Sequence, residues 1–256
     1  MNSLEKLFLK KDKNLLSIFF TAGFPNLHDT VTIINELSNN DVDFIEVGLP
    51  YSDPLADGTT IQHSSSVALK NGMNLDLAFK QLQTLNNNSI PLVAMGYLNQ
   101  IMRYGEETFC KMLKACHIDT LIIPDLPLYE YEVYYKGLFD KYGLNMVFLI
   151  TPQTSEDRIR KIDKLTKTFI YVVAASAITG FKKEVSKEQI SYFKRIKNMH
   201  LQSKLIIGFG IHNCKTFNTA CKYANGAIIG SAFINELNKS GICGIANFVN
   251  RLKAIK

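Results

Sequence analysis

Short apolar segments recur at wide and fairly regular spacing along the 256 residues, and they limit the possible folds more than any other feature. Each is a nearly continuous run of hydrophobic residues without polar-apolar alternation. The eight runs lie at 15–20, 44–49, 91–97, 120–126, 146–151, 169–175, 204–210 and 227–233. Such runs are typical of strands covered on both faces, which favours a parallel sheet.

Segments with helical spacing lie between and after these runs, at 28–40, 65–85, 106–116, 129–143, 155–166, 187–197, 214–224 and 241–256. Strand followed by helix, repeated eight times, predicts an α/β fold, a (β/α)8 TIM barrel that forms a single domain over residues 1–256. The segment 3–10 is predicted as an extra N-terminal helix that closes the barrel floor. An open doubly wound sheet is the alternative, because one sequence does not give the strand order.

Composition excludes several classes of protein. The net charge is +6, but 24 of the 29 basic residues are lysines scattered along the chain, so nucleic acid is not an expected partner. The five cysteines show neither disulfide nor zinc spacing, and we expect no metal site. The charged N-terminus is unlike a signal peptide, and no apolar run reaches the ~18 residues of a membrane span. We therefore expect a cytoplasmic protein without membrane contact.

Two acids follow the second apolar run. Glu46 lies inside FIEVG, and a period of two along the strand places it on the face that meets the barrel mouth. Asp57 follows eleven residues later, after a turn-rich loop. A glutamate paired with a core lysine and an aspartate that caps a turn are the structural alternatives. Two carboxylates at this place can also have different catalytic roles: one transfers a proton, and the other stabilises a developing cation.

Glycine-rich turns follow the last three apolar runs. Gly210 ends the seventh run, and Gly230 and Ser231 end the eighth, which is where barrels of this kind hold phosphate. Gly180 is a further glycine after the sixth run. Thr179 beside it lies in a loop, and its hydroxyl can reach Asp57 when this loop closes. These turns predict a phosphate site.

Other candidates are weaker. Asp125 ends the fourth run and either bonds the loop of Asp57 or caps a helix, while Phe19 and Tyr171 are expected to be core residues. All five histidines fall in predicted helices or loops, so we do not expect a catalytic imidazole. No lysine ends a strand in an apolar setting, which argues against Schiff-base chemistry.

The ordered motifs EVGLPYSDPLADG, TAGFP, PDLP, SAITG, GFGI and IIGSA closely resemble the tryptophan synthase alpha chain family over nearly the whole chain. The resemblance implies a carbon-carbon lyase of tryptophan biosynthesis that cleaves indole-3-glycerol phosphate to indole and glyceraldehyde 3-phosphate. It implies no cofactor in this chain. The implied partner is the beta chain, which carries pyridoxal phosphate, receives indole through a tunnel and forms an alpha2beta2 tetramer with the alpha chain.

The resemblance also implies roles for single residues. Glu46 matches the catalytic acid/base, and Asp57 matches the carboxylate that stabilises the indole nitrogen. The remaining implied residues line the indole pocket (Phe19, Tyr171), hold phosphate (Thr179, Gly180, Gly210, Gly230, Ser231) or face the beta chain (Pro50, Asp53, Asn99).

Two positions depart from the family pattern. Thr59 stands where the family commonly has proline, and Ala177 replaces a usual glycine, which bears on loop closure. These departures leave open a catalytically weak barrel subunit that binds and activates a beta chain. Another sugar-phosphate-binding barrel enzyme, such as an isomerase or epimerase, is the second alternative, while the acid pair and the absence of a strand-end lysine disfavour indole-glycerol-phosphate synthase.

Overall fold

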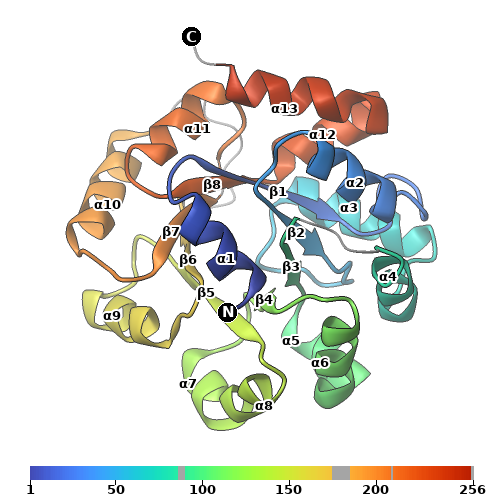
Figure 1. Cartoon of the computed structure of the whole chain (residues 1–256), viewed down its shortest axis with the longest axis horizontal. Helices are drawn as coiled ribbons and strands as arrows, with labels where there is room; N and C mark the ends of the chain where they lie inside the picture. The colour runs from blue at the N-terminus through green and yellow to red at the C-terminus, as the bar shows by residue number, and fades with distance from the viewer. Residues whose placement is uncertain (86–89, 175–184, 209, 255–256) are drawn as a thin grey trace.

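Eight parallel strands form a closed barrel in the computed structural model, which describes residues 1–85, 90–174, 185–208 and 210–254. The strands follow one another around the ring in chain order, and β8 closes it by pairing with β1 (Figure 1). The strands are β1 Leu15–Thr21, β2 Phe44–Gly48, β3 Leu92–Met95, β4 Thr120–Ile122, β5 Asn145–Ile150, β6 Phe169–Val173, β7 Lys204–Gly208 and β8 Gly226–Ile229. The predicted (β/α)8 barrel is confirmed. The doubly wound alternative is wrong, because an open sheet has two unpaired edge strands, whereas here β1 and β8 pair with each other.

Helices surround the barrel (Figure 1). They are α1 Ser3–Lys10, α2 Thr30–Asn39, α3 Thr59–Lys70, α4 Leu75–Leu82, α5 Leu98–Tyr104, α6 Glu106–Ala115, α7 Leu128–Glu130, the π-helix η1 Tyr131–Tyr135, α8 Lys136–Lys141, α9 Glu156–Leu165, α10 Lys187–Asn198, α11 Cys214–Cys221, α12 Ser231–Ser240, the 3-10 helix η2 Ile242–Gly244 and α13 Ile245–Lys253. None of the described helices is long and apolar enough to cross a membrane.

The strands are covered on both faces, as their continuous apolar sequences predict. Every residue of β1 and β2 is buried. One set of side chains fills the barrel interior, and the other packs under the helices. The interior set comprises Leu4, Phe8, Leu15, Phe19, Phe44, Val93, Ile122, Val147, Phe169, Tyr171, Val173, Ile206 and Ile228. The barrel is therefore a packed core whose polar groups are confined to few positions.

Two predicted boundaries are corrected by local backbone geometry. The single helix predicted at 65–85 is two helices, because Gly72 has φ +95° and the Asn74 side chain caps α4 by accepting from the Leu77 amide. The run predicted as a strand at 227–233 ends at Ile229, since Gly230 is already the N-cap of α12. Because β8 ends at Ile229, the N-terminus of α12 lies directly at the barrel rim.

Helix α1 lies across the amino-terminal end of the barrel (Figure 1). Its Leu4 and Phe8 side chains belong to the interior set, and the Ser3 amide and hydroxyl donate to Asp119 beside β4 at 2.8 and 3.0 Å. The opposite face of the helix is polar or exposed. The predicted N-terminal helix that closes the floor is confirmed.

We expect Leu4→Ala to lower the free energy of unfolding by about 2–5 kcal/mol, because the side chain is fully buried and its loss leaves a cavity in the barrel interior. Leu9→Ala in the same helix is the matched control, since Leu9 is 76% exposed. It is expected to change stability by no more than about 0.5 kcal/mol. Urea unfolding followed by circular dichroism measures both, and equal losses would show that α1 does not seal the barrel.

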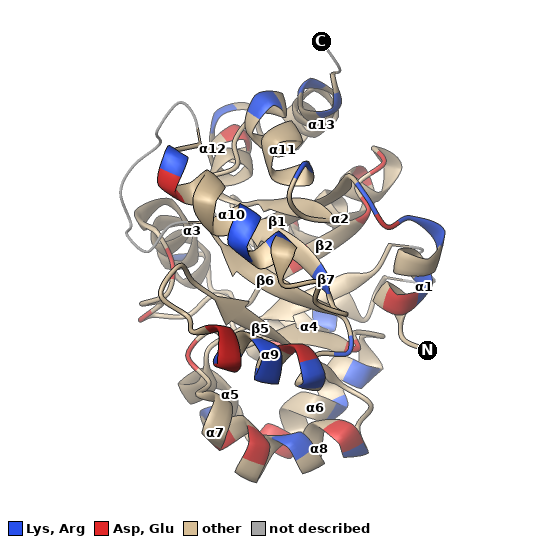
Figure 2. Cartoon of the chain, turned by 90° about the vertical axis from the view of Figure 1, so that its left-hand side faces the viewer, with Lys and Arg blue, Asp and Glu red and all other residues tan. Residues whose placement is uncertain are grey.

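Surface charges of both signs are interspersed on the face that carries α8, α9 and α10 (Figure 2). Asp140 there accepts from Lys136 and Lys167 at 2.8 Å each, and Lys161 pairs with Glu132. Exposed pairs of this kind contribute little to stability. They leave no broad field of one sign on this face.

Candidate active site

The candidate site lies at the carboxyl-terminal ends of the strands, on the rim opposite α1. Phe19 of β1 pairs in register with Glu46 of β2, and Glu46 pairs with Val93 of β3. Side chains two residues apart along a strand share a face, so Phe44 and Glu46 both point into the barrel. Phe44 belongs to the interior set, which places Glu46 one layer above it in the mouth.

Glu46 is a buried acid. Glu46 is 1% exposed, and its Oε2 atom has no hydrogen-bond partner among the described residues. Burial first, and then the charge of the nearby Asp57, raise the pKa of Glu46 to about 8. None of the described lysines forms an ion pair with it. At neutral pH this carboxyl therefore holds its proton and can donate it.

Asp57 is fixed by its loop and by a tyrosine. Its amide donates to the Pro54 carbonyl at 3.0 Å, and its own carbonyl accepts from Gln62 Nε2 at 2.9 Å. Its Oδ2 accepts from the Tyr97 hydroxyl at 2.8 Å, whereas Oδ1 is buried without a described partner. Burial raises the pKa of Asp57 and the hydrogen bond from Tyr97 lowers it, so that the net pKa is about 6. Asp57 is thus mostly ionised at neutral pH.

The two acids share one electrostatic environment with Tyr171. Burial raises the pKa of Tyr171 well above its usual value, and the charges of Glu46 and Asp57 raise it further. The mouth therefore combines a protonated acid, a carboxylate and a neutral phenol. Groups whose pKa values are pushed apart in this way are suited to acid-base chemistry. The structure brings together both acids that the sequence predicted.

Tyr97 was missed by the sequence reasoning. It follows β3 by two residues and is 4% exposed. The available signal was a polar aromatic residue directly after a strand, at the same rim as Glu46. Asp125 also lies at this rim. Its Oδ1 accepts from the Leu98 amide at 2.9 Å, at the first residue of α5, so it caps a helix, which is the second of its two predicted roles.

Two glycines make room for the aromatic side chains of the mouth. A Cβ at Gly48 would lie 2.6 Å from Phe19 Cζ, and a Cβ at Gly208 would overlap the Tyr171 ring. Phe19 is 4% and Tyr171 is 7% exposed. The expectation that both are core residues is confirmed by their burial, and they also form the apolar wall beside the acids.

The glycine turns lie at the same rim. A Cβ at Gly230 would lie 3.4 Å from Phe19 Cδ1, and Ser231 is the first residue of the ten-residue helix α12. Gly210 follows β7, is exposed and has φ +75°, and its carbonyl contacts His212 Nδ1 at 2.9 Å. The other predicted residues of this group, Thr179 and Gly180, lie outside the described residues, as does Ala177.

The residues predicted to face a partner lie beside Asp57. Asp53 and Asn99 are exposed, whereas Pro50 is buried and its carbonyl accepts from Gln100 Nε2 at 2.8 Å. Two large apolar side chains are also exposed in this sector: Leu55, 84% exposed in the loop after β2, and Met102, 53% exposed on α5. The loop that carries Asp57 thus also exposes a large apolar side chain, Leu55.

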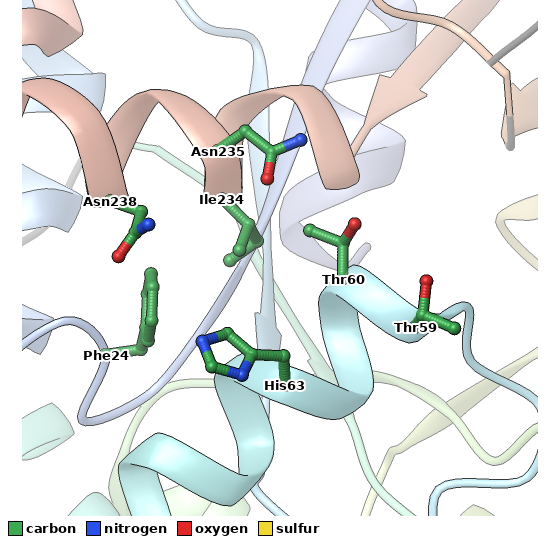
Figure 3. Close-up of a pocket in the computed structure, with 7 residues that line it drawn as sticks. All are labelled: Phe24, Thr59, Thr60, His63, Ile234, Asn235 and Asn238. Atoms are coloured by element: carbon green, nitrogen blue, oxygen red, sulfur yellow. The ribbon is translucent and has the colours of Figure 1, made fainter. Parts of the chain in front are cut away.

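A separate surface pocket of about 240 Å³ lies between α3 and α12 (Figure 3). Neither acid lines it. Its lining residues are Phe24, Thr59, Thr60, His63, Ile234, Asn235 and Asn238. Thr59 is the first residue of α3, so the departure from proline lies at a helix start that faces this pocket and not at the acids.

Fold and site together define a class: closed (β/α)8 barrels with a pair of buried carboxylates at the carboxyl-terminal mouth. Residues 6–255 match the sequence model of the family described as Tryptophan synthase alpha chain. The chain belongs to the tryptophan synthase alpha chain family.

Similar proteins agree with this assignment. The chain is 54% identical to the tryptophan synthase alpha chain of Flavobacterium johnsoniae, over 96% of this chain and 97% of that one. Its fold matches the tryptophan synthase A-subunit of Pyrococcus furiosus with a TM-score of 0.87 and 31% identity, over 96% of this chain and 99% of that one. Tryptophan synthase from M. tuberculosis shares the fold, with a TM-score of 0.86 and 24% identity over 98% of each chain. The chain therefore has the alpha subunit role in tryptophan biosynthesis, which is a lyase role.

Proposed function

We propose that the chain cleaves indole-3-glycerol phosphate to indole and glyceraldehyde 3-phosphate. The observation that supports this most is the unequal acid pair: Glu46, with a pKa of about 8, beside Asp57, with a pKa of about 6. A retro-aldol cleavage of an indole derivative needs a proton donor for a ring carbon and an anion for the charge that follows. Between these pKa values one side chain is a donor and the other is an anion.

The first step transfers the Glu46 proton to C3 of the indole ring. The new C3–H bond breaks the aromaticity of the five-membered ring and places positive charge on its nitrogen. The Asp57 carboxylate accepts a hydrogen bond from this N–H and offsets the charge. Because both acids are almost fully buried, at 1% and 3% exposure, this stabilisation acts in a low dielectric and is stronger than in water.

The second step returns a proton to Glu46. The hydroxyl on the glycerol carbon attached to C3 gives up its proton to the Glu46 carboxylate, and the bond between this carbon and C3 breaks. Its electron pair returns to the ring and restores aromatic indole, while the glycerol carbon becomes the aldehyde of glyceraldehyde 3-phosphate. Glu46 ends the cycle protonated, and no net proton is consumed.

Phe19 and Tyr171 hold the indole ring in this proposal, because they form the apolar wall beside the acids. Gly210, Gly230 and Ser231 hold the phosphate, together with Thr179 and Gly180. Support comes from the helix N-terminus at Ser231, where amide groups and the helix dipole favour an anion. Gly230 adjoins Phe19, so the phosphate and the ring are held at neighbouring places.

We expect Gly208→Ala to weaken binding of indole by about 1–3 kcal/mol, because the added methyl group overlaps the Tyr171 ring and forces it to move. Equilibrium titration of the protein with indole measures the effect. Gly137→Ala is the control: this exposed glycine of α8 has open space around its Cβ position, and its replacement favours the helix. Equal affinity in both variants would remove Tyr171 from the indole pocket.

The proposed reaction needs no cofactor in this chain. Its steps are two proton transfers and one carbon-carbon cleavage, and the indole ring itself takes up the electron pair. Pyridoxal phosphate is assigned to the beta chain only, where the indole is consumed.

A beta chain is the proposed partner, in an alpha2beta2 tetramer. The exposed Leu55 and Met102 support this, because large apolar side chains beside polar ones such as Asp53 and Asn99 are typical of an interface core and its rim. This surface adjoins the Asp57 loop, so bound indole and the partner lie at the same end of the barrel.

Indole release from indole-3-glycerol phosphate tests the proposed function, measured with the chain alone and with a beta chain. Release in both cases supports an active enzyme, and release only in the mixture shows dependence on the partner. Absence of release in both overturns the proposal. If the chain nevertheless accelerates indole consumption by the beta chain, it is a catalytically weak activating subunit.

A further inference from the structure

Tyr97 is held at the barrel mouth by contacts on both sides of its backbone. The Gly96 amide donates to the Ile122 carbonyl at 3.1 Å, which extends the β3–β4 ladder past the end of β3. The Leu98 amide donates to Asp125 Oδ1 at 2.9 Å. Tyr97 therefore projects from a fixed point between β3 and α5.

The Tyr97 hydroxyl makes two hydrogen bonds whose directions are determined. The Ala56 amide donates to it at 3.2 Å, so the hydroxyl is an acceptor there. Its own proton is left for Asp57 Oδ2, at 2.8 Å. A hydrogen bond of this direction favours a carboxylate over a carboxylic acid at Oδ2. The same phenol thus ties Asp57 and the residue before it to β3.

Tyr51 supports Tyr97 from the outside. The two rings stack with centroids 5.2 Å apart and an interplanar angle of 24°. Asn99 Nδ2 donates to the Tyr51 hydroxyl at 2.9 Å, and Asn99 itself is exposed. A continuous line of contacts therefore leads from the surface through two aromatic rings to Asp57.

We propose that Tyr97, held in place by Tyr51, is a positioning residue that keeps the Asp57 carboxylate ionised and aimed into the barrel mouth. The catalytic consequence of this role rests on the proposed cleavage, whereas the effect of Tyr97 on the orientation and ionisation of Asp57 does not. It assigns a role in the reaction to a residue outside the acid pair. Removing the hydroxyl leaves the ring in place and frees Asp57 to rotate and to hold a proton.

The charged and titratable groups around this pair are few among the described residues. Glu46 and Tyr171 interact with Asp57, and Asp125 faces Tyr97. Burial first, and then Asp57 itself, raise the pKa of Tyr97, so its hydroxyl keeps its proton over the whole pH range in which Asp57 titrates. The phenol can therefore donate to the carboxylate at any pH in that range, and losing this hydrogen bond must raise the pKa of Asp57.

The test compares Tyr97→Phe with Tyr104→Phe. Tyr104 lies on α5 and donates to Asp76 at 2.7 Å, which gives a matched tyrosine-aspartate pair away from the mouth. Carbon-13 NMR of protein labelled at aspartate carboxyls follows the titration of Asp57, whose resonance is assigned by its absence in Asp57→Asn. We expect the pKa of Asp57 to rise by about one unit in Tyr97→Phe and to stay unchanged in Tyr104→Phe.

Kinetics give a second readout. The acid limb of kcat is expected to move up by the same amount, about one pH unit, in Tyr97→Phe, with KM nearly unchanged. Tyr51→Leu removes the stacked ring but keeps the Tyr97 hydroxyl. It should raise the pKa of Asp57 by less than Tyr97→Phe does. An unchanged Asp57 titration in both Tyr97→Phe and Tyr51→Leu overturns the inference. Absence of indole release by the unmodified chain overturns the proposed function instead, and the NMR titration is independent of that result.

Discussion

Glu46→Gln is expected to abolish release of indole from indole-3-glycerol phosphate while leaving substrate binding nearly intact. The amide keeps the shape of the carboxyl group but can neither give a proton to C3 nor take one from the glycerol hydroxyl. Acid-base groups contribute about 10²–10⁴-fold in rate, and Glu46 serves in both steps, so the loss should reach the upper end of this range or exceed it. Steady-state kinetics and a binding titration with an uncleavable indole phosphate measure the two effects.

Glu107→Gln is the matched control for this variant. Glu107 lies on α6, is half exposed, and accepts from Lys141 and Tyr142, neither of which belongs to the mouth. The same chemical change there should leave turnover unaffected. If Glu46→Gln instead loses binding strongly and keeps its kcat, Glu46 is a ligand contact and the proposed division of labour between the two acids is wrong.

Asp57→Asn is expected to lower kcat by about 10²–10³-fold, the usual cost of removing one group that stabilises transition-state charge. It should also change the pH profile. In the unmodified chain activity falls as the pH drops through about 6, because a protonated Asp57 cannot offset the ring charge. Activity also falls as the pH rises through about 8, because Glu46 loses the proton it must donate. Rates measured across this pH range give both limbs.

The variant has no titrating group at position 57, so its acid limb near pH 6 should disappear. Its alkaline limb should move to lower pH, since the Asp57 charge is one of the two causes that raise the pKa of Glu46. Asp76→Asn, which alters the surface partner of Tyr104, is the control and should keep both limbs. An acid limb that persists in Asp57→Asn would assign it to a different group.

The positions of the two acids could be predicted from the sequence because strand ends are visible in it. Continuous apolar runs mark the strands, and the closed parallel barrel puts every strand end at one rim. Glu46 and Asp57 were therefore predictable as neighbours. Gly210 and Gly230 were predictable at this rim for the same reason, and their proposed contact with phosphate remains a prediction.

The contacts that tune the acids were not predictable. Tyr97 and Asp57 are 40 positions apart, and their hydrogen bond depends on the fold of the loop after β2 and on the exact end of β3. The close approach of Tyr171 to Gly208 depends on the register between β6 and β7. The break between α3 and α4 depends on one backbone angle at Gly72. Each is set by three-dimensional packing, which local pattern does not contain.

The pairing of β1 with β8 also determines when the mouth can form during synthesis of the chain. Phe19 is made before its neighbour Gly230, and the intervening strands must be in place before the two meet. A nascent chain that stops before β8 has an unpaired β1 edge, open to association with other chains. The mouth, with Phe19 beside Gly230, can therefore form only after β8 has been made and has paired with β1.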